Sequence, residues 1–354
     1  MTQNTTSSPI THITHAEIPY PKSWIDQLTA WIDRAPGPSW GFYVATLLVL
    51  AFMNNAIFWI DGSQAVGSFD PVKIADAVLV LFFLALYHHL SKVAGQSFAV
   101  FQSALKLPEA ELKILDYRLT TMPQRLGWLA IFVGIVISIQ SIQSDPASFG
   151  LNTAQTLLPV IYQYVLMIFL APSFVALIFQ MLRQFQLVIT LHRQVLNVDI
   201  FQLTPFHAFA RFTARAGVGL VVFVIYNIIY GFVFEVIGSL LSVVVFASVL
   251  AVSVFVIPLL GIQRRLQAEK ERHLSEANEA IKITFSRIHA QVNSDTYEKI
   301  PGLNTTLTAL VEQRNFMKQI STWPWDTSTL RGFASTLLVP VFLWLVTTLL
   351  ERLI

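Results

Sequence analysis

Long uninterrupted apolar stretches constrain this chain more than any other feature of its sequence. The run from residue 216 to residue 262 is too long to cross a lipid bilayer once, but it fits two helical crossings of about 20 residues each. Hydrophobic residues make up 54% of the 354 residues and charged residues only 12%, against roughly 25% charged residues in soluble domains. The sequence therefore predicts a polytopic membrane protein.

Seven apolar segments fit helical crossings, so the expected fold is an all-α, polytopic transmembrane helix bundle of about seven spans. Helices suit such segments because each one satisfies its own backbone hydrogen bonds in lipid. Span two is short, and a re-entrant segment is the alternative there. Glu235 with Gly238 and Ser239 is the expected turn between spans five and six. The expected spans are residues 40–60, 74–90, 126–143, 156–181, 216–234, 240–262 and 330–350.

A long polar block, Gln263 to Arg331, separates the last two expected spans. No helix breaker follows Ile262, so span six should continue into this block as one helix. A return near Pro301 and a second apolar stripe predict a cytoplasmic helical hairpin over residues 263–329. The two stripes can pack on each other or on a partner chain. Interface candidates are Ile281, Ile288 and Leu310. The stripes also include Leu266, Ala277, Thr284, Val292, Leu307, Val311, Phe316 and Met317.

The first 38 residues form a separate region. Residues 1–22 contain no apolar core, so we expect a disordered tail and no cleavable signal peptide. A short amphipathic helix should follow, and two placements are open for it: in the lipid headgroup layer, or on the cytosolic face of the protein itself. Its apolar face contains Trp24, Leu28, Trp31 and Ile32, with Asp26 and Asp33 off that face.

The distribution of basic residues predicts the orientation. With the N-terminus in the cytoplasm and seven spans, only Lys73 and Arg352 among the 23 lysines and arginines fall outside, which satisfies the positive-inside rule. The C-terminus would then lie outside the cell (inner or plasma) membrane. The expected regions are residues 1–38 (tail and interfacial helix), 39–262 (six spans), 263–329 (hairpin) and 330–354 (last span).

Polar side chains inside the expected spans are candidates for a pore or pocket, because burying them in lipid is costly unless they are paired or line water. Asn227 and Tyr230 are three residues apart and share a helix face. Asn54 and Asn55 lie in span one. The alternative is that these side chains hydrogen-bond neighbouring helices and serve only to hold the bundle together.

Basic side chains near the inner ends of the spans suit contact with anionic lipid headgroups. Their alternative role is to fix the topology. The candidates are Arg183, Arg211, Arg264 and Arg265.

Recognisable catalytic and metal-binding motifs are absent from the sequence. It contains no cysteine, no GxSxG, no HExxH and no phosphate-binding glycine loop. His88 and His89 point about 100° apart on a helix and cannot chelate one ion together. Asp199, His192 and His207 only weakly resemble the His and Asp cluster expected of a membrane-embedded transferase. We therefore expect no catalytic residue, no metal and no cofactor, and the net charge of +2 does not suggest nucleic acid.

Two segments carry a resemblance to a family. The sequences LHRQVLNVDIFQLTPFHAFARFTA and RNFMKQISTWPWDTSTLRGF, the second directly before the last span, resemble uncharacterised polytopic prokaryotic membrane proteins with a cytoplasmic helical hairpin. The resemblance covers roughly the C-terminal half. It implies an architecture and no functional residue.

Two hypotheses about function follow. The first is a non-enzymatic regulatory, sensory or scaffold protein that acts through the hairpin, whose partner is a cytosolic protein or a second copy of the chain bound at residues 263–320. The alternative is an ion channel or passive transporter with Asn227 and Tyr230 facing the pore. The lipid bilayer is the expected environment in both.

Overall fold

The computed structural model describes residues 19–105, 107–194, 203–233, 237–294, 299–323, 325 and 327–353. This part of the chain is built from α-helices with three short 3-10 helices and no β-strand, so the expected all-α fold is confirmed. The α-helices are α1 (Trp24–Arg34), α2 (Ser39–Asp61), α3 (Pro71–Phe101), α4 (Glu109–Thr120), α5 (Gln124–Ser144), α6 (Leu157–Gln194), α7 (Thr204–Val233), α8 (Ile237–Asn293), α9 (Ile300–Gln319) and α10 (Thr327–Leu353).

Six of these helices are long and apolar enough to cross a lipid bilayer, which indicates a multi-pass membrane protein. They are α2, α3, α5, α6, α7 and α8, and they correspond to the first six expected spans. The seventh expected span lies within α10, which is not one of the six. That span stays a prediction.

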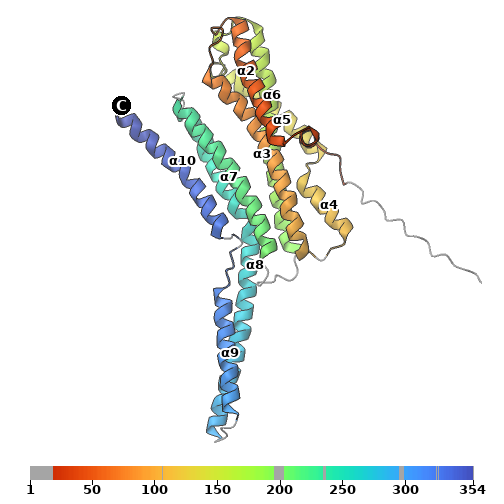
Figure 1. Cartoon of the computed structure of the whole chain (residues 1–354), viewed down its shortest axis with the longest axis vertical. Coiled ribbons are helices and arrows are strands. Elements are labelled where there is room, and N and C mark those ends of the chain that lie inside the picture. Colours follow the sequence, from red (N-terminus) through yellow and green to blue (C-terminus); the bar gives the residue numbers. More distant parts are fainter. Residues whose placement is uncertain are drawn as a thin grey trace, which may run out of the picture.

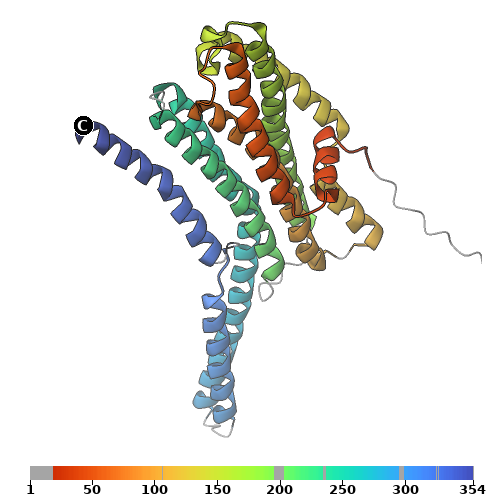
Figure 2. The ribbon, with the colours of Figure 1, turned by 45° about the horizontal axis from the view of Figure 1, so that its top comes forward.

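The six helices lie side by side in one bundle, from which the second half of α8 projects (Figure 1). The helix α9 runs back along this projecting half, and the two together form a stalk, residues 263–294 and 299–319 (Figure 2). From the base of the stalk, α10 turns back toward the bundle and packs on α7.

The expected continuation of span six into the polar block is confirmed. The helix α8 runs for 57 residues and tolerates Pro258 inside it, as membrane helices do when neighbours satisfy the freed carbonyl. Glu235, in the expected turn before it, lies outside the described residues, and Gly238 and Ser239 belong to the first turn of α8. Residues 1–18, Asp199 and Asp326 also lie outside the described part of the chain.

The helix that contains span two is longer than the expected residues 74–90. The helix α3 is a single element of 31 residues. It begins early because Pro71 occupies the first helical position and the Asp70 carboxylate accepts a hydrogen bond from the Val72 backbone. It continues past Leu90 because no proline or glycine pair interrupts it before Phe101.

The buried face of α1 also differs from the expected one. Ile25, Asp26, Thr29 and Ile32 are buried, whereas Trp31 is 57% exposed. The helix packs on the protein itself rather than standing free. The face is rotated because Asp26 finds hydrogen-bond donors inside the bundle, which an apolarity pattern does not register.

Small residues allow the helices of the bundle to approach closely. A Cβ atom added to Gly134 on α5 would lie 2.4 Å from the backbone nitrogen of Pro172 on α6. Close approach at small residues is a common way for membrane helices to associate. Between α3, α6 and α7, the rings of Phe83, Phe174 and Phe223 pack with centroids 4.8 to 6.3 Å apart.

We expect Gly134→Ala to destabilise the protein by about 1–3 kcal/mol, because the added methyl group meets backbone atoms that cannot move aside. Thermal unfolding in detergent measures the effect. Gly261→Ala is the matched control, since nothing lies within 4 Å of its added Cβ atom. Equal melting temperatures for the two variants would contradict the close α5–α6 packing.

Candidate functional site

The carboxylate of Asp26 joins α1 to the bundle. It accepts hydrogen bonds from the Tyr87 hydroxyl at 2.7 Å, the Met122 backbone nitrogen at 2.9 Å and the Ser23 hydroxyl at 2.6 Å. These donors come from α3, from the connection between α4 and α5, and from the residue that caps α1. One buried side chain therefore ties together three segments that are far apart in sequence.

A second carboxylate on α1, Asp33, lies beside the start of α2 and the second half of α3. It contacts His88 Nε2 at 3.0 Å and Lys92 Nζ at 2.6 Å. The other ring nitrogen of His88 lies 3.0 Å from the Tyr43 hydroxyl. The sequence suggested no carboxylate partner for His88. The structure supplies one from α1, across 55 positions of the chain.

The two aspartates have opposite electrostatic properties. Burial raises the pKa of Asp26, and the hydrogen bonds from Ser23, Tyr87 and Met122 act in the other direction without cancelling it. Burial also acts to raise the pKa of Asp33, but the hydrogen bonds from Lys92 and His88 outweigh burial, and the pKa is lowered. Asp33 therefore has a lower pKa than a free aspartate, and Asp26 has a higher one.

A cavity of about 400 Å³ opens between α1, α3 and the segment that precedes α5. Its wall contains both aspartates together with Lys22 and Lys92, so the cavity is lined by charges of both signs. The buried hydroxyl of Ser91 has no hydrogen-bond partner. The cavity is lined by Lys22, Asp26, Thr29, Ala30, Asp33, His88, Ser91, Lys92, Gly95, Gln96, Thr120 and Thr121.

Polar side chains of α6 hold the wall of this cavity in place. The side-chain amides of Gln180 and Gln184 both donate to the Leu119 carbonyl at the end of α4, at 3.3 Å and 3.0 Å. The Arg183 guanidinium donates to the Thr121 carbonyl and to the Tyr20 hydroxyl. Arg183 was predicted as a lipid-headgroup contact, and the structure places it within the protein.

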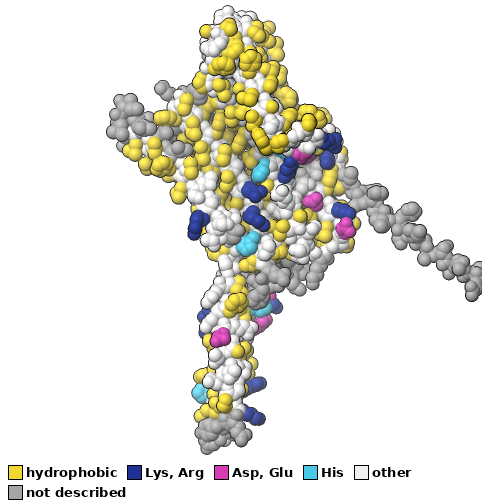
Figure 3. Space-filling view, viewed as in Figure 1, with side chains coloured by type: hydrophobic (Ala, Val, Ile, Leu, Met, Phe, Trp, Pro, Cys, Tyr) yellow, Lys and Arg dark blue, Asp and Glu magenta, His cyan; other side chains and the backbone are white. Residues whose placement is uncertain are grey.

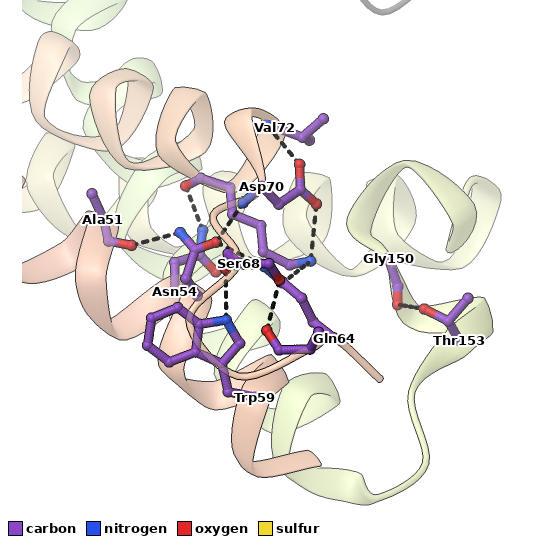
Figure 4. A network of polar contacts seen from close by, with 12 residues as sticks. Ala51, Asn54, Trp59, Gln64, Ser68, Asp70, Val72, Gly150 and Thr153 are labelled. Atoms are coloured by element: carbon purple, nitrogen blue, oxygen red, sulfur yellow. Dashed lines mark hydrogen bonds and ion pairs between the residues drawn. The ribbon is translucent and has the colours of Figure 1, made fainter. Parts of the chain in front are cut away.

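At the opposite end of the bundle, a polar network folds the connection between α2 and α3 (Figure 4). The Asn55 side-chain oxygen accepts from the Asp70 backbone at 2.8 Å and from Gln64 at 3.3 Å. The Asn54 amide donates to the Lys73 carbonyl at 2.7 Å. The Lys73 ammonium pairs with Asp70 at 3.1 Å. Both asparagines, predicted as pore or pocket residues, therefore contact this connection.

The predicted pair on α7 lies inside the bundle. Asn227 is only 6% exposed, and its amide donates to the carbonyl of Phe223 one turn earlier. The Tyr230 ring stacks on Tyr226 at 5.9 Å, and the Tyr226 hydroxyl donates to the Ala75 carbonyl on α3. The Tyr226 hydrogen bond joins α7 to α3.

The remaining predicted basic residues cluster where the bundle meets the stalk. Lys and Arg side chains gather on the part of the bundle nearer the stalk, while its far end is covered by hydrophobic side chains (Figure 3). Arg211 and Arg264 are exposed there. Arg265 donates to the His192 carbonyl at 2.9 Å and the Arg193 carbonyl at 3.3 Å, and so binds the C-terminal end of α6.

The stalk packs largely through the predicted stripes. Ala277, Thr284 and Met317 are buried, and Ile281, Ile288 and Leu310 are partly buried. The Lys270 ammonium donates to the Ile320 and Lys318 carbonyls just beyond and at the end of α9. Two stripe residues were placed wrongly: Val292 is 43% exposed and Phe316 is 60% exposed. In the last part of α9, Met317 takes the inward position, so the adjacent Phe316 points outward.

Sequence reasoning missed the two aspartates of α1 as structural contacts. A signal was present, because Ser23 followed by Asp26 resembles the capping box that begins many helices, and Ser23 does accept a hydrogen bond from the Asp26 backbone. The partners on α3 could not be found, because no local pattern links residues so far apart.

We expect Asp26→Ala to cost about 2–3 kcal/mol of unfolding free energy, because the Tyr87 hydroxyl and the Met122 amide lose their buried acceptor. Asp33→Ala should cost less than about 1 kcal/mol, since its ion pairs are partly solvated. Unfolding in detergent, followed by intrinsic tryptophan fluorescence, measures both. Equal losses would show that Asp26 is not the dominant anchor of α1.

The contribution of Asp33 to stability should depend on pH. Its pKa is lowered in the folded protein, so the stabilisation is present above the unfolded value of about 3.9 and is lost as the pH falls through the folded pKa. Melting temperatures of the natural protein and of Asp33→Asn should therefore differ near about pH 6, and this difference should shrink as the pH falls below about 3.9. A constant difference over that range would contradict the lowered pKa.

Comparison with known proteins identifies no relative: no family model, no curated protein and no solved structure matches this chain. Among the described residues, no three His, Asp or Glu side chains lie together in a way that would hold a metal ion. The evidence about function therefore comes from the geometry of the chain itself.

Proposed function

We propose that this chain is a non-enzymatic regulatory or scaffold protein of the cell membrane whose stalk binds a cytosolic protein. The observation that carries the proposal is the single helix α8. Its 57 residues run without a break from the far end of the bundle to the tip of the stalk. A continuous helix of this length transmits a displacement in the membrane to its other end.

Basic residues support a cytoplasmic stalk. The connections on the stalk side of the bundle carry nearly all lysines and arginines, which the positive-inside rule assigns to the cytoplasm. This orientation places the N-terminus in the cytoplasm. With α10 as a seventh span, the C-terminus lies outside.

The base of the stalk is coupled to the bundle by packing. Phe255 on α8 stacks on Phe333 of α10 with ring centroids 3.9 Å apart, and it stacks on Trp325 at 5.0 Å. A Cβ atom added to Gly217 on α7 would lie 2.6 Å from the Phe333 ring, so α7, α8 and α10 meet with no spare room. A shift of α7 or α8 must therefore move the start of α10 and, through α8, the stalk.

The outer surface of the stalk offers apolar contacts to a partner. Phe285 is 53% exposed and Phe316 is 60% exposed, on α8 and α9 respectively. Aromatic residues of this kind are enriched at the centres of protein interfaces. The surrounding charged residues of the stalk would provide the polar rim.

The alternative of a channel or passive transporter has less support from the geometry. The Asn227 and Asn54 amides are used in hydrogen bonds to backbone carbonyls, and Tyr230 stacks on a neighbouring tyrosine. The Asn54 contact joins α2 to α3, and these contacts of Asn227 and Tyr230 lie within α7.

Photo-crosslinking in cells tests the proposed partner. A photoreactive residue in place of Phe285 or Phe316 should give a discrete crosslinked product with a cytosolic protein, identified by mass spectrometry. The matched control replaces Thr306, an exposed polar residue of α9. Crosslinks only to a second copy of the chain, or the same pattern at Thr306, would contradict a cytosolic partner.

A further inference from the structure

The candidate membrane helix α3 carries a carboxylate that has no partner among the residues the structure describes. Asp76 is in α3, about 8 Å along the helix from Pro71, and is partly buried. It makes no hydrogen bond or ion pair with any residue that the structure describes. The nearest base along the helix, Lys73, pairs with Asp70 at 3.1 Å, contacts Gln64 at 3.3 Å and lies over a phenylalanine ring.

Three tyrosines on α6 and α7 lie within electrostatic range of this carboxylate. Asp76 interacts electrostatically with Tyr162 on α6 and with Tyr226 and Tyr230 on α7. The Tyr226 hydroxyl donates to the carbonyl of Ala75, directly beside Asp76. The charged groups that act on Asp76 from its own helix are Asp70 and Lys73. None of the groups facing it from α6 or α7 is a cation.

Buried oxygen atoms without partners lie in the same layer of the bundle. The Tyr162 hydroxyl and the side-chain oxygens of Asn54 and Gln163 are buried and have no hydrogen-bond partner. Asn54 is 0% exposed and Gln163 is 1% exposed. Leaving such atoms unsatisfied costs about 1–3 kcal/mol each, so a bound cation or buried water that contacts them would stabilise this layer.

A hydrogen bond between the end of α2 and the start of α6 shows that Asn54 and Gln163 lie at the same level along the bundle. The Asp61 carboxylate at the end of α2 accepts from the Thr156 backbone, just before α6 begins, at 2.7 Å. Asn54 and Gln163 each lie about two helical turns from that contact, on helices that run in opposite directions. Asn54 also donates to the carbonyl of Lys73, one turn before Asp76.

The geometry points to a binding site for a monovalent metal cation of the size of sodium, with Asp76 as its charged ligand. The available atoms are all oxygens, which hard cations prefer. One carboxylate balances one positive charge, whereas a divalent ion would leave a net charge in an apolar bundle, which is costly. Tyr162 provides a neutral hydroxyl oxygen on α6, and Asn54 and Gln163 provide the unpaired acceptors of the same layer. The proton competes with the metal ion for Asp76.

Labelling by a hydrophobic carbodiimide tests the site on the purified full-length protein. The reagent attacks a protonated carboxyl group in an apolar environment, and mass spectrometry identifies the modified peptide. We expect Asp76 to be labelled in choline chloride. Sodium at about ten times its dissociation constant should slow labelling about tenfold, because only the unoccupied fraction reacts. Asp76→Asn should remove the labelled peptide, and Glu109→Gln, which removes an exposed carboxylate of α4, should leave it unchanged.

Thermal unfolding provides a second measurement that does not depend on the reagent. Sodium chloride should raise the melting temperature above that in choline chloride for the natural protein but not for Asp76→Asn. Tyr162→Phe, which removes one oxygen atom, should weaken the sodium effect. Labelling that is insensitive to sodium would overturn the metal site and leave a proton-binding carboxyl. The same sodium response in the natural protein and Asp76→Asn would also overturn it. None of these results depends on a partner of the stalk.

Discussion

The need to satisfy backbone hydrogen bonds inside an apolar layer governs this structure. A helix satisfies its own backbone hydrogen bonds, so each long apolar segment becomes a helix. Many of the polar contacts between segments then lie near the helix ends. The hydrogen bonds between distant segments follow this division. Asp61 joins α2 to the start of α6 at one end of the bundle, and Asp26 joins α1 to α3 at the other.

The two ends of the bundle differ in chemistry. At the end far from the stalk, short connections are folded by side-chain bonds to backbone, such as Asn55 to the amide of Asp70. At the stalk end, carboxylates on α1 pair with bases and hydroxyls on α3, next to a cavity of about 400 Å³. This asymmetry agrees with the proposal that the protein binds its partner on the stalk side.

The helix α8 connects the two proposed sites, the ion site in the bundle and the partner-binding surface of the stalk. Its first half packs against α7 in the bundle, and its second half carries the stalk. Arg265 fixes α8 to the end of α6 at the point where the helix leaves the bundle, and Lys270 fixes the end of α9 to α8 one turn later. An ion bound at Asp76 would act on α7 through Tyr226, and α7 contacts α8 along its length in the bundle.

The sequence alone determined the helical class, the positions of six membrane helices, the unbroken path of α8 and most of the stalk stripe. Hydrophobicity and helical periodicity are local properties, and they decide these features. The tertiary structure alone decided which face of α1 is buried, that Arg183 binds Thr121 and Tyr20, and that Tyr226 donates to the carbonyl of Ala75 beside Asp76. Those features depend on hydrogen bonds and charges between helices far apart in the chain, which a local pattern of residues does not record.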